Sequence, residues 1–392
     1  MLQTEYDNNV LTIKFEGKID SLNAPAIEDE INLVRKNFPA DTIILDCDKL
    51  EYTTSAGLRV VLRLKQEVDD THLINVHPEV YEIFDMTGFT DMMDVQKAYR
   101  VVSVDGCEVI GQGANGKIYR IDRDTIVKVY LNEDALEEIH RQRELAREAF
   151  ILGIPTAIPF DVVRIEGGGY GSVYELLNAT SYAKLLIRGE KTIDEVAEMS
   201  VQMLRLIHSK VIKPGTMPDM KAVALNWAEF LKDYLPAEQF EKLYSLIDAV
   251  PVDMHMMHGD YHLKNVMFQN GESLLIDMDT VCHGHPVFEF ASIYNAYCGY
   301  CAIDHSVIES FLGISYETGQ AFWRRILELY FDTKDESFLR EVENKAKIVG
   351  YTRIMRRTIR RNGLNTEAGR AEIDNCRAVL AELLPGTDTL LF

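Results

Sequence analysis

The stretch MHGDYHLKNVMF (residues 257–268) gathers an aspartate, an asparagine, a lysine and two histidines within eight positions. An apolar run, SLLIDMD (residues 273–279), follows soon after and contains two aspartates at its end. This block reads as loop, strand, turn and strand, so the end of the second strand returns to the loop. We therefore expect Asp260, Asn265 and Asp277 to lie close together.

The bulk composition predicts a folded protein of more than one domain. The chain has 392 residues, which is long for one domain and sufficient for two or three. Apolar residues make up 47% and charged residues 26%, as in chains with a packed core. The net charge of −21 argues against nucleic acid as a partner, because such a surface repels phosphate backbones.

The sequence predicts a cytoplasmic protein without a membrane span. It contains no run of 18 apolar residues, and the first residues lack the basic flank and apolar core of a signal peptide. Six cysteines are scattered over the chain, which suits a reducing compartment. The stretch CGYC (298–301) has redox-motif spacing, but it falls inside a predicted helix, which favours ordinary core cysteines.

The first hundred residues alternate between short strands and amphipathic helices, which predicts an α/β domain. The predicted strands are residues 10–17, 41–47 and 72–77, and the predicted helices are residues 23–38, 53–68 and 78–88. A second pattern begins near residue 104 with two strand-like runs, a charged helix from Glu133 to Leu152 and a further strand. From about Thr192 the chain is mostly helical.

A glycine-rich turn, GQGANG (111–116), joins the two strand-like runs and matches G-x-G-x-x-G. The residues after it, KIYRI, are strand-like, so the motif predicts a hairpin rather than the start of a helix. Such a hairpin places the backbone N–H groups of Gly111, Gly113 and Gly116 over phosphates. A plain β-hairpin turn is the alternative for the glycines taken alone.

Lys128 lies in the apolar strand TIVKVY (125–130), where an ammonium group is costly unless it finds an anion. A nucleotide phosphate would provide one. The following helix offers Glu144 and Glu148 as carboxylates to orient the lysine, and Glu144 is the expected partner. Each glutamate alone is also explained as a solvated residue.

The opening stretch suits phosphoryl transfer, which needs an acid near the acceptor hydroxyl and oxygen ligands for Mg²⁺. Asp260 suits the first role, and Asn265 and Asp277 suit the second. His258 and His262 are expected to brace the loop. Zinc is the rival for a cluster of His and Asp, but neither H-E-x-x-H nor a cysteine pair accompanies it.

Residues from about 104 to the end resemble the aminoglycoside phosphotransferase and choline kinase-like family. HGDYHLKN is similar to the H-G-D-x-H-x-x-N loop of that family, and LLIDMD to its metal-binding strand. The resemblance implies a protein kinase-like fold over residues 103–392, with a β-rich N-lobe over about 103–178 and a helical C-lobe over about 179–392. Leu263 and Lys264 stand where the family has smaller residues or proline.

The same resemblance implies ATP and Mg²⁺ as cofactors and assigns roles to residues. It implies Asp260 as the catalytic base, Asn265 and Asp277 as Mg²⁺ ligands, and Lys128 on the α- and β-phosphates. The segment YELL (174–177), which includes Glu175 and Leu177, is implied as the hinge near adenine, and Asp279 as an aid to the metal. It leaves the hydroxyl acceptor unidentified.

The stretch EYTTSAGLRVVL (51–62) combines helix-capping hydroxyls with apolar residues at helical spacing. Simple capping explains it, and so does a phosphorylation switch at the start of a helix. Residues 1–102 resemble the STAS domain of anti-sigma factor antagonists, which implies Ser55 as a phosphosite and an anti-sigma factor-like protein as a partner. Thr54 stands where that family has Asp, so Thr53 and Thr54 are alternative sites.

The leading hypothesis is an ATP- and Mg²⁺-dependent phosphotransferase acting on an alcohol group, with a regulatory STAS domain. The alternatives are a kinase-like switch that phosphorylates Ser55, a nucleotide-binding adaptor without catalysis, and an antibiotic-inactivating enzyme. A run of arginines, YTRIMRRTIRRNG (351–363), either docks an acidic surface or anionic substrate or forms a solvated, salt-bridged helix. The run FEFASIYNAYC (288–298) predicts a core helix beneath the site.

Overall fold

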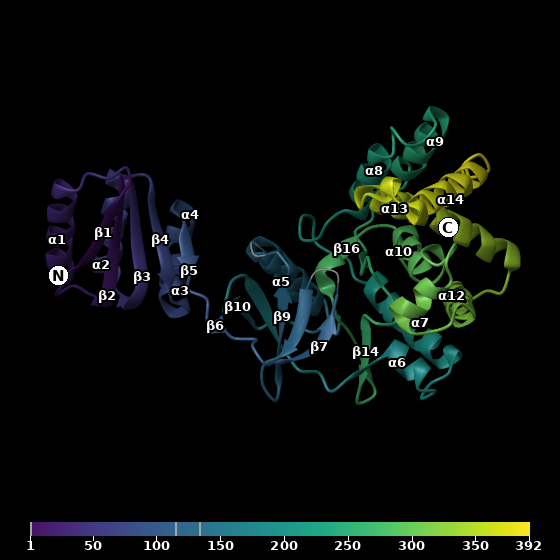
Figure 1. Cartoon of the computed structure of the whole chain (residues 1–392), viewed down its shortest axis with the longest axis horizontal. Coiled ribbons are helices and arrows are strands. Elements are labelled where there is room, and N and C mark those ends of the chain that lie inside the picture. The colour runs from purple at the N-terminus through teal and green to yellow at the C-terminus, as the bar shows by residue number, and fades with distance from the viewer. Residues whose placement is uncertain (1, 114–115, 133–134) are drawn as a thin grey trace. The chain divides into compact units, whose positions relative to one another are not determined.

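The structure is a computed structural model that describes residues 2–113, 116–132 and 135–392. Two compact units form, and both are drawn in Figure 1. The first contains residues 1–106 and 162–171, and the second contains residues 107–161 and 172–392. Each unit is described below by itself.

The first unit is built on a five-stranded sheet with the strand order β1-β2-β3-β4-β5. β1 and β2 are antiparallel, whereas β2, β3, β4 and β5 run parallel to one another. The predicted α/β alternation is confirmed. The elements are β1 (Gln3–Asp7), β2 (Val10–Ile19), α1 (Ala24–Asn37), β3 (Thr42–Thr53), α2 (Ser55–Glu67), β4 (Thr71–Val76), α3 (Pro78–Met86), α4 (Phe89–Met92), β5 (Val95–Lys97) and β6 (Val101–Val102).

The core of the first unit follows from the alternation along its strands. In β2 the side chains of Leu11 and Ile13 are buried, while the residues between them are half-exposed, as period-two patterning requires. Helix α2 buries one face, including Val60 and Leu64, against this core. Gly57 in its first turn allows the close approach, because an added Cβ would collide with Thr53 Oγ1.

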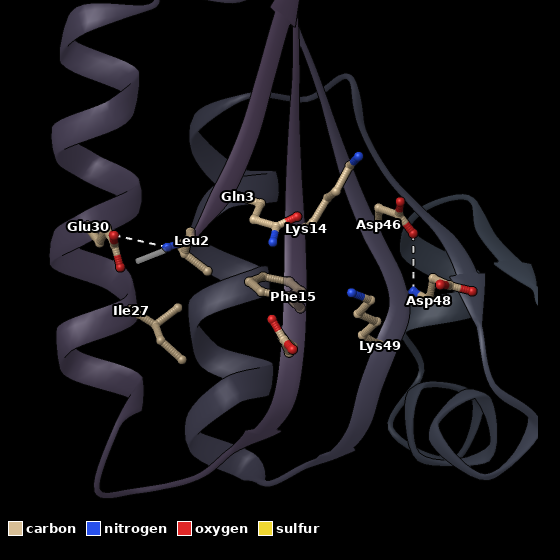
Figure 2. A pocket seen from close by; sticks show the side chains of 10 residues that line it. Leu2, Gln3, Lys14, Phe15, Ile27, Glu30, Asp46, Asp48 and Lys49 are labelled. Carbon is tan, nitrogen blue, oxygen red and sulfur yellow. Dashed lines mark hydrogen bonds between the residues drawn. The ribbon is translucent and has the colours of Figure 1, made fainter.

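A cavity of about 480 Å³ opens on the first unit beside β2 and β3 (Figure 2). Its lining mixes two lysines and four carboxylates with apolar side chains. The lining residues are Leu2, Gln3, Lys14, Phe15, Glu16, Ile27, Glu30, Asp46, Asp48 and Lys49. Lys14 is already paired with Glu5 at 2.6 Å. The four carboxylates outnumber the two lysines, so the lining is acidic overall.

The β-rich part of the second unit carries Lys128 in the middle of a sheet. β7 and β8 form an antiparallel hairpin, and β8 pairs antiparallel with β9, the strand that contains Lys128. The predicted hairpin is thus confirmed, although Ala114 and Asn115 of its turn and Glu133, where the next helix was expected to begin, lie outside the described residues. The elements are β7 (Glu108–Gln112), β8 (Gly116–Arg120), β9 (Thr125–Tyr130), α5 (Leu136–Ile151) and, from residue 172 on, β11 (Tyr170–Glu175). Strand β10 (Asp161–Ile165) falls in the first unit apart from its first residue.

The helical part of the second unit surrounds α10, whose residues from Val287 to Tyr294 are all buried. The predicted core helix is therefore confirmed. The elements are β12 (Thr180–Ser181), α6 (Tyr182–Ile187), α7 (Ile193–His208), α8 (Met220–Phe230), α9 (Ala237–Asp248), β13 (Met256–Met257), β14 (Val266–Gln269), β15 (Glu272–Leu275), η1 (Met278–Thr280), β16 (Cys282–His283), α10 (Pro286–Tyr294), the π-helical turn η2 (Asn295–Gly299), α11 (Ser306–Leu312), α12 (Tyr316–Phe331), α13 (Glu336–Arg360), η3 (Gly363–Asn365) and α14 (Glu367–Leu383).

Replacing Gly57 with valine is expected to destabilise the first unit by about 1–3 kcal/mol, as overpacking of a filled core does. The first atom of the new side chain would lie only 2.8 Å from Ile19 Cγ2 and collide with Thr53. Hydrogen exchange of peptides from β2 and α2, measured by mass spectrometry on the full chain, gives the local stability. Ser55→Val places the same side chain on the exposed turn beside it and should change protection little. Equal protection in the two variants would show that the tight packing of Gly57 against Thr53 and Ile19 does not contribute to stability.

Candidate active site

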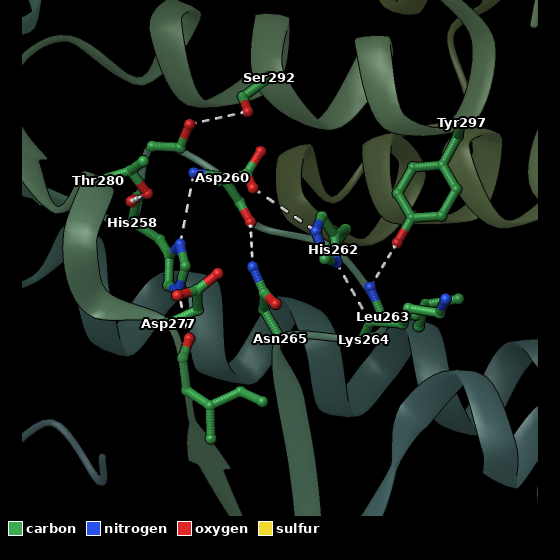
Figure 3. A network of polar contacts seen from close by, with 12 residues as sticks. His258, Asp260, His262, Leu263, Lys264, Asn265, Asp277, Thr280, Ser292 and Tyr297 are labelled. Carbon is green, nitrogen blue, oxygen red and sulfur yellow. Dashed lines mark hydrogen bonds and ion pairs between the residues drawn. The ribbon is translucent and has the colours of Figure 1, made fainter. Parts of the chain in front are cut away.

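The loop between β13 and β14 is held by hydrogen bonds from its backbone to a buried carboxylate. Glu289 of α10 is completely buried, and it accepts bonds from the N–H groups of His258 (2.6 Å) and Gly259 (3.0 Å). Gly259 has φ +77°, and an added Cβ would collide with the carbonyl oxygen of Thr280. The Ser292 hydroxyl donates to the Gly259 carbonyl at 2.9 Å. The backbone of the loop is therefore fixed by helix α10, which carries Ser292 and runs above the loop in the view of Figure 3.

Both histidines of the loop contact it, as the sequence predicted. The Asp260 N–H donates to Nδ1 of His258, which leaves the proton on Nε2 facing the Ile276 carbonyl at 3.3 Å. The Lys264 N–H likewise donates to Nδ1 of His262, so Nε2 of His262 carries the proton that faces Asp260 Oδ2 at 3.6 Å. Each imidazole thus connects two parts of the site.

Asp260 stays ionised although its surroundings are partly dry. Burial alone would raise its pKa, but the hydrogen bond and charge of His262, followed by the charge of Arg353, lower the pKa to about 2. Arg353 Nη2 lies 3.9 Å from Asp260 Oδ1. The carboxylate is 42% exposed, so it remains open to a ligand. A carboxylate with this pKa is a weak base but a permanent hydrogen-bond acceptor.

Asn265 lies between the loop and the turn that carries Asp277. Its side chain is buried, and Nδ2 donates to the Asp260 carbonyl at 3.0 Å, which leaves Oδ1 as the acceptor end of the amide. Its backbone carbonyl accepts a bond from the Ile276 N–H at 2.9 Å. Asn265 and Asp277 therefore lie at adjacent ends of the β14–β15 hairpin and supply an amide and a carboxylate.

Lys128 and Asp277 meet across 149 positions of the chain. The Lys128 ammonium lies 2.9 Å from Asp277 Oδ1, and its side chain is only 16% exposed. Burial alone would lower the pKa of Lys128, but the charges of Asp277, Tyr130 and Asp279 and the hydrogen bond to Asp277 together outweigh it, so the pKa is raised. Asp277 has φ +60°, a left-handed backbone that aspartate tolerates better than most side chains. The expected convergence of the strand lysine with this aspartate is present.

Asp279 adds a second carboxylate to the same turn. Burial, and after it the charge of Asp277, raise the pKa of Asp279 to about 6, and the charge of Lys128 opposes this effect. The region has more negative than positive charge around Lys128. The described part of the chain groups no three His, Cys, Asp or Glu side chains as metal ligands. A magnesium ion fits a smaller donor set, because it keeps several waters and takes one or two carboxylates.

Glu144, the expected partner of Lys128, is not its partner. Its carboxylate contacts Arg147 at 3.3 Å and is 61% exposed. The residues of α5 that face the site are Gln142, which accepts a bond from the Tyr130 hydroxyl at 2.7 Å, and Glu138, which Gln142 contacts at 2.9 Å. Glu144 is two residues past Gln142, or about 200° around the helix, and so points to the opposite side.

The three glycines predicted to cover the phosphates belong to the hairpin of β7 and β8, which pairs with β9, the strand of Lys128. The Gly113 N–H donates to the Gly116 carbonyl at 2.9 Å, which closes the hairpin turn, and Gly111 lies in β7. At Gly116 an added Cβ would collide with the Val129 carbonyl of the neighbouring strand β9. The glycine at 116 therefore has a packing reason that is independent of any ligand.

The predicted hinge follows β11. Glu175 is exposed at the end of that strand and Leu177 is half-buried, while the Leu176 N–H donates to the Asp124 carbonyl at 2.8 Å. Tyr174 points inward. Burial, then Tyr130, raise the pKa of its phenol, so the ring forms part of the packed surface near Lys128.

The three consecutive hydroxyl residues at the start of α2 in the first unit have different environments. Thr53 is buried, and Thr54 is the N-cap, whose Oγ1 accepts a bond from the Ala56 N–H at 3.3 Å. Ser55 is the first residue of the helix and is exposed. Of the three, Ser55 is therefore the accessible hydroxyl.

Two residues at the site were missed by the sequence interpretation, Glu289 and the role of Arg353. A signal for the first existed, because an acid inside the apolar run FEFASIY requires buried hydrogen-bond donors. Arg353 donates to the Gly259 carbonyl (3.1 Å) and lies near Ser292 Oγ (3.0 Å). Helical spacing placed Arg353 on one face with other arginines, but not against this loop.

A β-sheet that carries Lys128 is joined to a helical part whose loop presents Asp260 and Asn265 and whose next turn presents Asp277. This arrangement is that of a kinase-like phosphotransferase fold. Residues 106–319 match the model of the phosphotransferase enzyme family known as APH, and the chain belongs to this family. Residues 1–102 match the STAS domain. The predicted resemblances and fold class are both confirmed.

Individual relatives agree with this assignment. The first part of the chain is 32% identical over 92 residues to BtrV of Bordetella bronchiseptica, a protein described as an anti-sigma factor antagonist, and the match covers 22% of this chain and 78% of BtrV. The fold is similar to that of aminoglycoside phosphotransferase APH(4)-Ia, with a TM-score of 0.51 and 12% identity over 72% of this chain and 94% of that one. A thermostable mutant of that enzyme in a ternary complex with ADP and hygromycin B gives 0.50 and 13% over 73% and 96%. No helix among the described residues is both long and apolar enough to cross a membrane.

Removing the buried carboxylate of Glu289 is expected to loosen the loop. Glu289→Ala leaves two buried N–H groups without an acceptor, which should lower the free energy of unfolding of the second unit by about 2–5 kcal/mol. Glu289→Gln keeps one acceptor oxygen and should lose less. Urea unfolding followed by tryptophan fluorescence measures this, because Trp227 and Trp323 both belong to the second unit. The exposed Glu309→Ala is the control, and an equal effect of the Glu309 and Glu289 changes would contradict the assigned role.

Proposed function

We propose that the second unit transfers the γ-phosphoryl group of ATP, bound with Mg²⁺, to a hydroxyl group of an acceptor. The observation that carries this proposal is the contact of Lys128 with Asp277, beside a loop that presents the ionised Asp260. A lysine and two or three oxygen-bearing side chains in this arrangement are the parts that phosphoryl transfer uses. Membership of a phosphotransferase family supports the same conclusion.

The nucleotide would be held by the β-rich part of the unit. In the proposal, Lys128 contacts the α- and β-phosphates, the glycine hairpin with Gly111, Gly113 and Gly116 covers them, and the segment from Glu175 to Leu177 lies at adenine. Asn265 Oδ1 and the Asp277 carboxylate are the metal ligands, with Asp279 in support. When bound, the Mg²⁺ ion neutralises charge on the phosphates and fixes their orientation. ATP as donor and the free cysteines suit a cytoplasmic protein.

Asp260 would act on the acceptor. A bond forms between the acceptor oxygen and the γ-phosphorus while the bond from that phosphorus to the β–γ bridging oxygen breaks, so ADP leaves with the electron pair. The hydroxyl proton passes to the Asp260 carboxylate. Because the pKa of Asp260 is about 2, the carboxylate orients the hydroxyl and takes the proton only as the new bond forms. His262 and Arg353 keep the carboxylate in place.

Asp260→Asn is expected to reduce ADP release in the presence of acceptor by about 10²–10⁴-fold, the usual contribution of a positioned acid or base. Binding of MgATP, measured by calorimetry, should stay within a few-fold, because Asp260 is assigned to the acceptor. Asp233→Asn, an exposed change of the same kind, is the control. ADP release that survives the Asp260 change would exclude catalysis by this loop, whereas MgATP binding without ADP release in the unchanged protein would favour a nucleotide-binding adaptor.

A second candidate function is phosphorylation of Ser55 in the same or another copy of the chain. It is favoured by the exposure of Ser55 at the start of α2, where the helix dipole favours a phosphate. Joining both parts in one chain raises the effective concentration of the acceptor. The similarity of the first part to an anti-sigma factor antagonist supports an anti-sigma factor-like partner that such a phosphate would control.

Incubation of the full chain with ATP and Mg²⁺ is expected to place phosphate on Ser55, as mapped by mass spectrometry. Ser55→Ala and Asp260→Asn should each abolish it, whereas Thr54→Ala should not, because Thr54 is engaged as the helix cap. If residues 53–55 stay free of phosphate while an added small alcohol is phosphorylated, the acceptor lies outside the chain.

A further inference from the structure

The arginines near the end of α13 form a row that begins at the candidate active site. Arg356 and Arg357 follow Arg353 by three and four positions, and Arg360 follows them by four and three, so the four residues share one broad face of the helix. We call these four residues the arginine row. The row therefore places positive charge beside the loop that carries the Asp260 carboxylate.

The first member of the row is already engaged by the loop. Arg353 donates to the Gly259 carbonyl at 3.1 Å and lies 3.9 Å from Asp260 Oδ1. Its guanidinium lies over the Trp227 ring of α8, 5.6 Å from the ring centre. Arg353 therefore positions Asp260 and is not free to hold a ligand with all its donors.

The next two members lie on aromatic rings. The Arg356 guanidinium is 5.7 Å from the ring centre of Phe230 in α8, and the Arg357 guanidinium is 4.9 Å from that of Tyr300 after η2. An arginine that lies over a ring keeps its N–H edges available for hydrogen bonds in the plane of the guanidinium. The rings orient these arginines without neutralising them.

The row also lacks carboxylate partners beyond Arg353. Among the described residues, no Asp or Glu oxygen lies within 4 Å of the guanidinium groups of Arg356, Arg357 or Arg360. The Nε of Arg356 is buried and has no hydrogen-bond partner. Burial, then the charge of Arg360, lower the pKa of Arg356, as expected for a cation without compensation. Elsewhere in this chain of net charge −21, Arg324 and Arg325 each contact two carboxylates, so the three arginines differ from that pair in being uncompensated.

We propose that the acceptor carries, besides the hydroxyl that Asp260 receives, an anionic phosphate or carboxylate group that Arg356 and Arg357 bind. The inference rests on the proposed function, because it assigns the substrate class of the same site. These arginines lie one helical turn, about 5 Å along the axis, beyond Arg353, and Arg360 lies about 11 Å beyond it. That spacing suits a small hydroxy acid or phosphorylated alcohol, and guanidinium forks match both anions. A polycationic amino sugar would meet like charge here.

Titration of inorganic phosphate into the full chain saturated with Mg²⁺ and a non-hydrolysable ATP analogue tests the row directly, because all three phosphate positions of the nucleotide site are then filled. Calorimetry should detect phosphate binding in the wild type. The double variant, Arg356→Gln with Arg357→Gln, should bind phosphate more weakly by about tenfold or by a larger factor. Arg340→Gln together with Arg361→Gln removes two charges from exposed positions in and just after α13 and is the control. A parallel titration with malonate shows whether the site favours phosphate or carboxylate.

The outcomes separate this inference from the proposed function. Binding of MgATP without phosphate binding at the row, or phosphate binding that the double variant retains, overturns the inference and leaves the nucleotide function standing. Phosphate binding in a protein that binds no nucleotide overturns the assignment of the row to an acceptor. A screen of alcohols by ADP release should turn over hydroxy acids or phosphorylated alcohols, with the advantage over their neutral analogues lost in the double variant. A screen in which only polycationic amino sugars react would contradict the inference.

Discussion

The contact between Lys128 and Asp277 is the constraint on which the rest of the second unit depends. An ammonium group in the middle of a strand is tolerated only beside an anion, and the partner comes from the far side of the sequence, 149 positions away. The strand β9 and the turn after β15 must therefore be assembled together. The same contact holds the lysine in place where phosphates would share it with Asp277, so what stabilises the fold also prepares the proposed nucleotide site.

The loop beside this pair depends on a helix that looks purely structural. Helix α10 and the turn η2 are buried on all sides, yet they contribute Glu289, Ser292 and Tyr297, whose polar atoms bond the loop backbone. A buried polar group is stable only when it is paired, so the loop and the helix each satisfy the other. This reciprocity fixes the loop backbone at Asp260 without engaging the carboxylate, which stays open for the proposed acceptor.

Spacing along the sequence predicted much of this arrangement, but it did not predict which residues pair across long stretches of the chain. The loop from His258 to Asn265 and the hairpin after it are set by short-range geometry, so the convergence of Asp260, Asn265 and Asp277 could be expected. The choice of Glu144 failed because the rotation of α5 against the sheet is decided by tertiary packing, which turns Glu138 and Gln142 inward. Glu289 could have been found from its apolar context. Arg353 could not, because many crossing angles of α13 would satisfy the same helical pattern.

Charge explains why the arginine row and the acidic loop belong together. Asp260 shares its part of a strongly acidic chain with the carboxylates of Asp277 and Asp279. The charges of His262 and Arg353 offset this negative charge at Asp260. The charges that lower the pKa of Asp260 belong to His262, Arg353 and His258, and an anion held by Arg356 and Arg357 would add negative charge one helical turn beyond Arg353. A negative charge near a carboxylate raises its pKa, so such an anion would make Asp260 a better proton acceptor. An anionic substrate would thus strengthen the base that acts on it, whereas a cationic one would hold that carboxylate in its weakest basic state.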